Sequence, residues 1–288
     1  MNPHVELVIV QLCFTALALG AKLALARVPP NALVLARVVG GAIAFFAIAR
    51  AWGRVRVARR DVPAIVGCAV LGVVINQVLF INGLARTTAV NATVIGATIP
   101  VFVAALAMAT GREPFRGRRV AGVAVAFAGT LALVGADRFD LTDAHVVGNL
   151  MVLVNAMSYA AFLVYVRPLA LRVPAMTLVA ALFAAAIPFV LPLGVAEWTA
   201  FAPAMTGRDG ALVLLVVAAT VLAYAVNQHA IGRADASVVA LYIYLQPILT
   251  ALGAVVLLGE RPGLRTAVSA AVILVGLAIA TLRRPVTT

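Results

Sequence analysis

Two stretches of 36 residues decide the fold: TIPVFVAALAMATGREPFRGRRVAGVAVAFAGTLAL (98–133) and LQPILTALGAVVLLGERPGLRTAVSAAVILVGLAIA (245–280). A shift of 147 positions places Pro100 on Pro247 and Glu113 on Glu260, without a gap. The 13-residue spacing between Pro and Glu recurs in both stretches, which chance explains less easily than matches of Ala or Gly in a chain rich in small residues. The chain therefore contains an internal repeat. Further matched pairs are Arg86 and Arg233, Ala89 and Ala236, Ala104 and Ala251, Ala107 and Ala254, Arg118 and Arg265, and Gly129 and Gly276.

The composition indicates a membrane protein. Of 288 residues, 64% are apolar and 11% are charged, and the mean hydropathy is +1.11. A soluble domain carries roughly 25% charged residues, so a soluble enzyme and a disordered chain are both excluded. Cys13 and Cys68 lie in apolar stretches and are expected to be buried residues rather than a disulfide framework. The net charge of +12 would suggest nucleic acid in a soluble protein, but here the arginines lie between apolar segments, so we expect no nucleic acid partner.

Apolar segments long enough to cross a bilayer recur along the whole chain. A spanning helix needs about 20 mostly apolar residues. The first segment resembles a signal peptide near 24–26, but it lacks a basic leading region, so we expect it to be retained. The sequence predicts ten transmembrane helices at 5–26, 33–51, 62–84, 88–110, 118–136, 146–166, 175–195, 211–231, 236–258 and 264–282.

The arginines predict the orientation. Ten spans place both termini on one side, where 14 loop or span-end arginines fall, against six on the opposite side. Because basic residues in short loops favour the cytoplasm, both termini are predicted to be cytoplasmic. The predicted location is a bacterial inner membrane.

The repeat divides the chain into halves of five spans, 1–140 and 141–288. Because five is odd, the second half enters the membrane with the opposite polarity, and the loops at 111–119 and 259–265 lie on opposite sides. The predicted fold is thus an all-α polytopic membrane protein built from two inverted-topology repeats. This architecture recurs in secondary transporters, in which one half rocks against the other.

The two quoted stretches resemble the EamA-type repeat of the drug/metabolite transporter superfamily. The shared elements are a Pro early in the fourth helix, a Gly-Glu pair near its end and a Gly-rich closing helix. The first helix departs from the pattern, because it lacks the Trp-Gly or Trp-Ser pair that is often present there. The resemblance covers nearly the whole chain and implies ten spans in two halves, with export of amino acids or other metabolites.

Polar residues within predicted spans are the candidates for a substrate site, because polar groups in lipid are costly and usually face a cavity or another helix. Lys22 lines the cavity or reaches the headgroups, and Arg37 either attracts a carboxylate or phosphate or anchors at the interface. Pro100 and Pro247 weaken two equivalent helices and are candidate hinges. The predicted cavity-lining residues are Gln11, Thr15, Lys22, Asn76, Asn91, Thr98, Asn155, Tyr159, Tyr224, Asn227, Tyr242, Tyr244 and Gln246.

Other features predict structure rather than a site. Glu113 and Glu260 are expected to organise loops by pairing with neighbouring arginines. No Asp or Glu lies in the middle of a predicted span, so facilitated diffusion is as plausible as proton antiport. The small residues of 118–136 and 264–282 suit close helix packing or a homodimer contact at the periphery. The sequence predicts no cofactor and no metal site.

We interpret the chain as a secondary transporter that exports small metabolites, in particular amino acids including aromatic ones, by alternating access around a central cavity. The alternative within transport is a carrier of drugs, nucleotide sugars or other metabolites. An intramembrane enzyme would need a Ser-His or paired-Asp constellation in the spans, which is lacking, and a receptor would not account for the inverted repeat.

Overall fold

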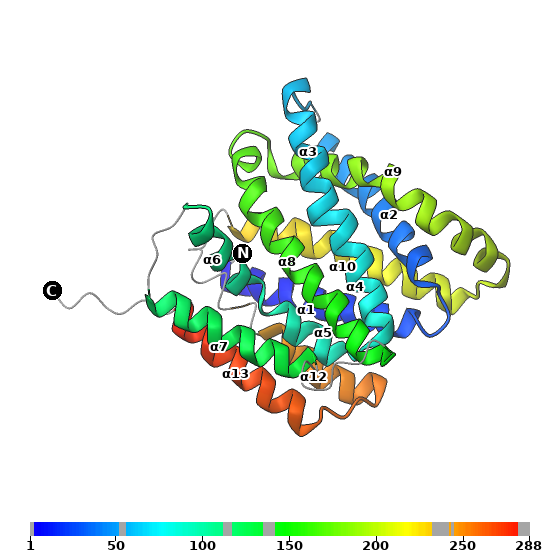
Figure 1. Ribbon diagram of the computed structural model, residues 1–288. Coiled ribbons are helices and arrows are strands. Elements are labelled where there is room, and N and C mark those ends of the chain that lie inside the picture. The colour runs from blue at the N-terminus through cyan, green and yellow to red at the C-terminus, as the bar shows by residue number, and fades with distance from the viewer. Residues whose placement is uncertain are drawn as a thin grey trace.

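The computed structural model describes residues 3–51, 56–111, 117–134, 142–231, 242 and 245–281, and the elements in this part of the chain are helical (Figure 1). The apolar runs are helical because the lipid interior offers no hydrogen-bonding partner for the backbone, which must therefore bond within each segment. The α-helices are α1 (Pro3–Ala24), α2 (Pro30–Ala51), α3 (Val62–Ala69), α4 (Asn76–Arg86), α5 (Ala89–Gly96), α6 (Ile99–Ala109), α7 (Gly117–Val134), α8 (Ala144–Ala170), α9 (Ala175–Phe201), α10 (Gly207–Ile231), α12 (Leu245–Leu258) and α13 (Leu264–Thr281).

In the described part of the chain, ten apolar helical segments overlap the ten predicted spans, the ninth being described from Leu245 onward, and the all-α membrane fold is confirmed. Three of the ten are shorter apolar helices, Val120–Leu133, Leu245–Leu258 and Leu264–Gly276. The other seven are long enough to cross a membrane: Val5–Ala24, Pro30–Ala51, Arg59–Arg86, Ala89–Ala109, Ala144–Ala170, Ala175–Ala204 and Gly207–Asn227.

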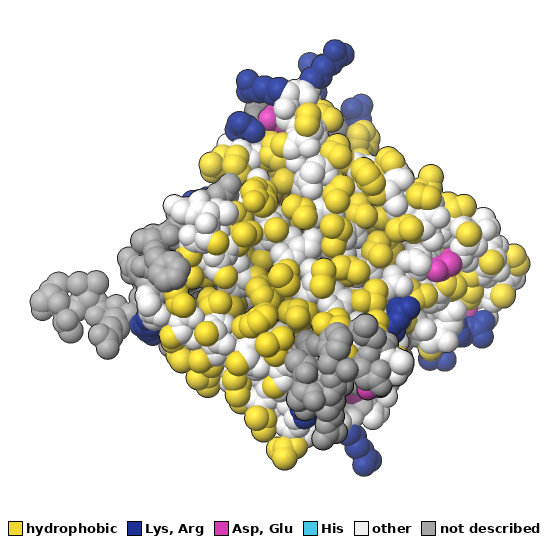
Figure 2. All heavy atoms as spheres, in the orientation of Figure 1, with side chains coloured by type: hydrophobic (Ala, Val, Ile, Leu, Met, Phe, Trp, Pro, Cys, Tyr) yellow, Lys and Arg dark blue, Asp and Glu magenta, His cyan; other side chains and the backbone are white. Residues whose placement is uncertain are grey.

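The surface carries a broad apolar face. Figure 2 shows mainly hydrophobic side chains between basic groups at the top and at the lower right of the view. Large side chains such as Leu214 and Val256 are 67% and 80% exposed. A soluble protein rarely exposes so much contiguous apolar surface, whereas lipid tails cover it without cost.

Two predicted spans are irregular where a continuous helix was expected. The third includes a π-helical turn, η2 (Val70–Ile75), between α3 and α4. The fourth is broken between α5 and α6, directly before Pro100. Because Pro lacks an N–H and its ring disfavours helix in the residues before it, this break has a local cause. The Thr98 hydroxyl donates to the carbonyl oxygen of Ile95 (2.6 Å), which satisfies one backbone acceptor at the break.

The helix contacts follow the repeat. The contact of α1 with α10 has its counterpart in the contact of α8 with α4. Likewise α1 with α12 matches α8 with α6, and α2 with α10 matches α9 with α3. The pairs α2 with α9 and α7 with α13 each join equivalent helices of the two halves. A two-fold exchange of the halves therefore reproduces the packing.

One hydrogen-bonded contact shows that equivalent helices run in opposite directions. Glu260, which follows α12, accepts hydrogen bonds from the backbone N–H groups of Ala89 (2.8 Å) and Val90 (3.3 Å) at the start of α5. The helix that ends near Glu260 is equivalent to the one that begins at Ala89. The end of α12 therefore lies beside the start of α5, the first part of its equivalent helix, as inverted repeats require.

Small residues bring α7 and α13 together along one side of the molecule (Figure 1). A Cβ atom at Gly276 would overlap the backbone nitrogen of Ala126, and one at Gly129 would lie 3.0 Å from the backbone nitrogen of Ile273. The glycines of these segments are thus used for packing within one chain. The predicted homodimer contact stays a prediction. It would have to use outward-facing side chains such as Phe127 and Leu131.

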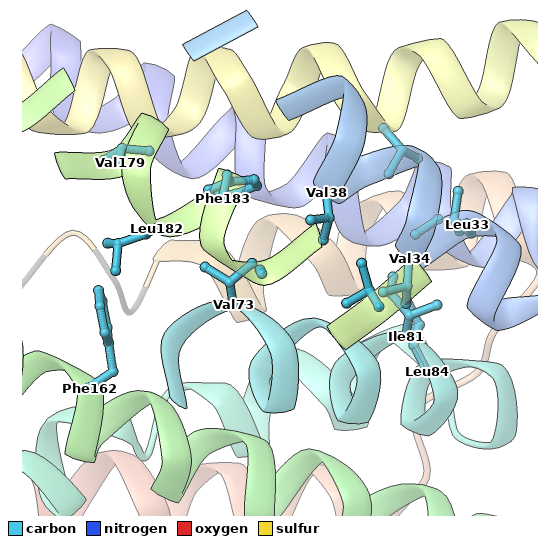
Figure 3. Packing of buried hydrophobic residues seen from close by; sticks show 14 of the residues in the cluster. Leu33, Val34, Val38, Val73, Ile81, Leu84, Phe162, Val179, Leu182 and Phe183 are labelled. Atoms are coloured by element: carbon cyan, nitrogen blue, oxygen red, sulfur yellow. The ribbon is translucent and has the colours of Figure 1, made fainter. Parts of the chain in front are cut away.

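A continuous hydrophobic core joins the two halves. In Figure 3 side chains of α2 and α4 meet those of α9 from the other half. Phe183 of α9 lies over Gly41 of α2, where a Cβ would come within 2.8 Å of the ring. Phe162 of α8 covers Gly72 in the π-helical turn in the same way. The buried residues that Figure 3 labels are Leu33, Val34, Val38, Val73, Ile81, Leu84, Phe162, Val179, Leu182 and Phe183.

Candidate functional site

Arg37 of α2 is the most informative polar residue, because it lies buried inside the helix bundle. Its side chain is 4% exposed, so the alternative of an anchor at the interface is wrong. The Nε atom donates to the hydroxyl of Thr220 on α10 (3.2 Å), and Nη1 has no hydrogen-bond partner among the described residues. An arginine within the bilayer costs about 2.5–3.5 kcal/mol on insertion scales, so such a group normally has a function or a partner.

Tyr224 of α10 lies beside this guanidinium group at the centre of an aromatic cluster. Its electrostatic interaction with Arg37 places the two side chains in the same site. The Tyr224 ring contacts those of Phe14 (6.2 Å between centroids), Phe45 (6.0 Å) and Phe183 (5.8 Å), in each case edge to face. These rings come from α1, α2 and α9, so the aromatic cluster joins both halves.

Tyr159 of α8 extends the cluster toward the other side of the bundle. Its hydroxyl is a hydrogen-bond partner of the Tyr224 hydroxyl, and its ring stacks at a tilt on Phe162 (5.4 Å). Two predicted site residues, Tyr159 and Tyr224, are therefore brought together by the fold.

Gln11 and Thr15 of α1 add polar atoms that lack partners. Both side chains are buried, and Oε1 of Gln11 and Oγ1 of Thr15 have no hydrogen-bond partner among the described residues. They flank Phe14, which contacts Tyr224, on a helix that packs on α10. Unsatisfied buried oxygens are uncommon in native proteins, so we expect these two oxygens to accept hydrogen bonds from a ligand or water.

Lys22 lies at the end of α1 and binds the end of another helix. Its Nζ atom donates to the carbonyl oxygens of Leu84 (2.8 Å) and Thr87 (2.5 Å), at the C-terminus of α4. A cation is favourable there, because helix C-termini carry partial negative charge. Glu260 lies near enough for charge attraction with Lys22. This cluster lies at a helix end and does not include Arg37.

Asn76 and Asn155 meet at the π-helical turn. The Asn155 side chain donates to the carbonyl oxygen of Asn76 (2.7 Å), and the Ser158 hydroxyl donates to that of Leu71 (2.9 Å). A π-helical turn alters the backbone bonding of its neighbours, and polar side chains of α8 supply donors here.

The two polar residues predicted on the fourth span have hydrogen-bond partners of their own. Asn91 lies in the first turn of α5, capped by Thr88, and its Oδ1 atom accepts from the Thr266 hydroxyl of α13 (3.1 Å). Thr98 bonds at the helix break before Pro100, as described above. Neither contact reaches the aromatic cluster.

The remaining predicted residues lie on α10 and around the start of α12. Asn227 is half-buried near the end of α10, and Gln246 and Pro247 are half-buried in the first turn of α12. Tyr242 is half-buried and has an interaction partner. Tyr244 lies outside the described residues.

Sequence reasoning missed several contributors to the site. Thr220, Phe14, Phe45 and Phe183 were not singled out, because hydroxyls and aromatic rings are common in apolar helices. A signal did exist for Arg37, the one arginine of the sequence that lies outside loops and span ends. Within the described ranges, His, Cys, Asp and Glu form no group of three that could hold a metal ion.

Comparison with known proteins agrees with this architecture. Over its length the chain is similar to a solved structure titled "Crystal structure of protein", with a TM-score of 0.66 and 22% identity, covering 97% of this chain and 96% of the other. At that identity the likeness shows the fold alone.

Two curated relatives are transporters by name. An uncharacterized transporter of Archaeoglobus fulgidus is 30% identical over 221 residues, 75% of each chain. A probable terminal-alkyne amino-acid exporter of Streptantibioticus cattleyicolor is 28% identical over 232 residues, 80% of this chain and 76% of its own length.

A family model matches the chain twice, once in each half, over residues 5–135 and 146–282. The family and the relatives are transporters, which are not enzymes, and the helices described here are those of a membrane protein. Because the family model matches both halves of the chain, the chain belongs to the EamA-like transporter family.

Proposed function

We propose that this protein exports small metabolites, in particular amino acids including aromatic ones, by alternating access. The observation that carries the proposal is the buried group of Arg37, Tyr224, Gln11 and Thr15, whose polar atoms are only partly hydrogen-bonded. It lies between helices of both halves of an EamA transporter. The named amino-acid exporter among the relatives supports the same substrate class.

The aromatic cluster supports a solute with an apolar body. Rings of Phe14, Phe45, Phe183 and Tyr224 offer edges and faces that suit contact with an apolar or aromatic group. The polar atoms beside them would bind the charged or polar end of the same solute. An amphipathic amino acid has both parts.

The inverted repeat supports alternating access. Helices α1 and α2 of the first half pack on α10 and α9 of the second, with the buried polar group between them. Exchange of the two halves' conformations would expose this group first to one side of the membrane and then to the other. Pro100, beside the broken helix, and Pro247 are the proposed hinges.

The proposed location is the bacterial inner membrane, with both termini in the cytoplasm. The excess of arginines on the side of the termini supports this orientation. Labelling of single cysteines placed at positions 114 and 261 tests it, since the two sites should be accessible from the cytoplasm and the exterior, respectively.

The experiment that tests the proposed function is counterflow of labelled L-phenylalanine into proteoliposomes containing the purified protein. Tyr224→Phe and Gln246→Ala should reduce the initial rate while folded yield stays normal, because each removes a polar group that would contact the substrate and Tyr224→Phe keeps the aromatic packing. Leu252→Ala, on a side chain that is 64% exposed, is the matched control and should transport like the wild type.

A competition panel identifies the solute class. Unlabelled amino acids, a nucleotide sugar and a cationic drug are each added in excess to the same assay. Competition by amino acids supports the proposal, whereas competition by the drug or nucleotide sugar alone would assign the protein to the other branch of the superfamily.

A further inference from the structure

The charge of Arg37 has no anionic partner in the part of the chain that the structure describes. A guanidinium group stays protonated at any physiological pH, so its charge cannot be relieved by losing a proton. Its two neighbours, the hydroxyls of Thr220 and Tyr224, are neutral groups at neutral pH. A buried unpaired charge is strongly unfavourable, and a ligand that brings a negative charge would compensate it.

Described acidic side chains elsewhere have partners of their own. Asp209 pairs with Arg27 (3.2 Å), and Asp61 pairs with Arg172 (2.9 Å). Glu197 accepts from the backbone of Asn31 and Ala32 at the start of α2, and Glu260 accepts from the start of α5. Asp143 caps α8, and Glu6 likewise has a partner. The interactions of Arg37 include none of these groups.

We propose that Arg37 binds the carboxylate of the transported solute, with Nη1 donating to a carboxylate oxygen. The inference rests on the proposed function and narrows its substrates to monocarboxylates, among which α-amino acids combine the carboxylate with an apolar side chain. A guanidinium fork matches the two oxygens of a carboxylate, and such charge-assisted bonds are about twice as strong as neutral ones.

A single arginine favours a carboxylate over a phosphate ester. A carboxylate carries one negative charge, which Arg37 balances, whereas a phosphate monoester carries nearly two at neutral pH. The other cation of α1, Lys22, is held by carbonyl oxygens at the end of α4. The charge of Arg37 would also repel a cationic drug that lacks an acid group.

The other groups of the site suit the rest of an amino acid. Oε1 of Gln11 and Oγ1 of Thr15 are acceptors without partners, as an ammonium group requires. Residues 11 and 15 are one helical turn apart and therefore share a face of α1. Tyr224 and the Phe rings would contact the side chain.

The test compares an acid with its amide on the purified protein. Affinities for L-phenylalanine, phenylacetate and L-phenylalaninamide are measured by competition with labelled L-phenylalanine or, if that tracer does not bind, with labelled phenylacetate. The wild type should bind both acids and bind the amide at least tenfold more weakly. Arg37→Gln should lower the affinity for the acids about 10- to 100-fold, the range expected for a lost hydrogen bond to a charged group.

Control variants separate ligand binding from packing. Arg37→Lys keeps the charge and should retain most of the preference for acid over amide. Thr220→Val removes the hydrogen bond of Arg37 to a described residue but leaves the charge, and should also retain that preference. Arg118→Gln removes an exposed positive charge elsewhere and should behave like the wild type.

Each outcome decides one of the two claims. If Arg37→Gln keeps the wild-type ratio of acid to amide affinity, or if the wild type binds neither acid, the carboxylate inference is overturned. If phenylacetate binds through Arg37 and amino acids do not, the inference stands and the proposed amino-acid export fails.

Discussion

Removing the carboxylate of Glu260 should weaken the contact between the two halves by about 2 kcal/mol. This side chain follows α12 in the second half and accepts from the first two N–H groups of α5 in the first half, at 2.8 Å and 3.3 Å. In Glu260→Ala these N–H groups lose their acceptor, since the start of a helix has no intrahelical partner for them.

The magnitude follows from the two distances. The bond to Ala89 is short and charge-assisted, a class that contributes about 1.5–3 kcal/mol, whereas the bond to Val90 is near the upper limit of length and adds little. Water can replace part of the loss because Glu260 is only half-buried. Glu260→Gln keeps one acceptor oxygen but loses the attraction to the helix dipole and to Lys22, so we expect about 1 kcal/mol.

The assay is thermal unfolding of the purified protein in detergent, followed by tryptophan fluorescence. At about 2–4 °C per kcal/mol for a chain of this size class, Glu260→Ala should lower the Tm by about 4–8 °C and Glu260→Gln by about half as much. Arg261→Gln, at the exposed neighbouring residue, is the matched control and should unfold like the wild type. Equal Tm values for Glu260→Ala and Arg261→Gln would refute the reasoning.

Two further predictions concern packing and energy coupling. Gly276→Ala should reduce the Tm and the folded yield by an amount equivalent to about 1–3 kcal/mol, because its methyl group would overlap the backbone of α7, whereas Gly263→Ala, with open space around it, should not. A pH gradient across proteoliposomes should change the transport rate little, since the described buried carboxylates, Glu6, Asp61 and Asp209, lie at helix ends rather than at mid-membrane. A severalfold acceleration by the gradient that Glu6→Gln abolishes would contradict this second expectation.

The helices and their repeat could be predicted from the sequence because both depend on local features of the chain. Apolar length predicts a span whatever surrounds it, and the matched Pro100 and Pro247 define the register between halves. The inversion followed from an odd number of spans per half, and the bonds from Glu260 to α5 agree with it.

The site was less predictable because it depends on how each helix is rotated. A helix that is apolar all round has no polar face to indicate its inner side. From the sequence, Arg37 could lie inside the bundle or at the interface. Its burial and its contact with Thr220 decide between the two positions. The π-helical turn at Val70–Ile75 contains no Pro that would predict it from the sequence. Its hydrogen-bonding partners lie on α8, far away in sequence.

The helix caps supplied across the halves have a consequence for biosynthesis. The first N–H groups of α2 are bound by Glu197, and those of α5 by Glu260, so residues made late complete helices made early. While the ribosome is still synthesising the second half, these helix starts must remain solvated by water or headgroups. Final consolidation of the N-terminal half is thus coupled to the emergence of the C-terminal half.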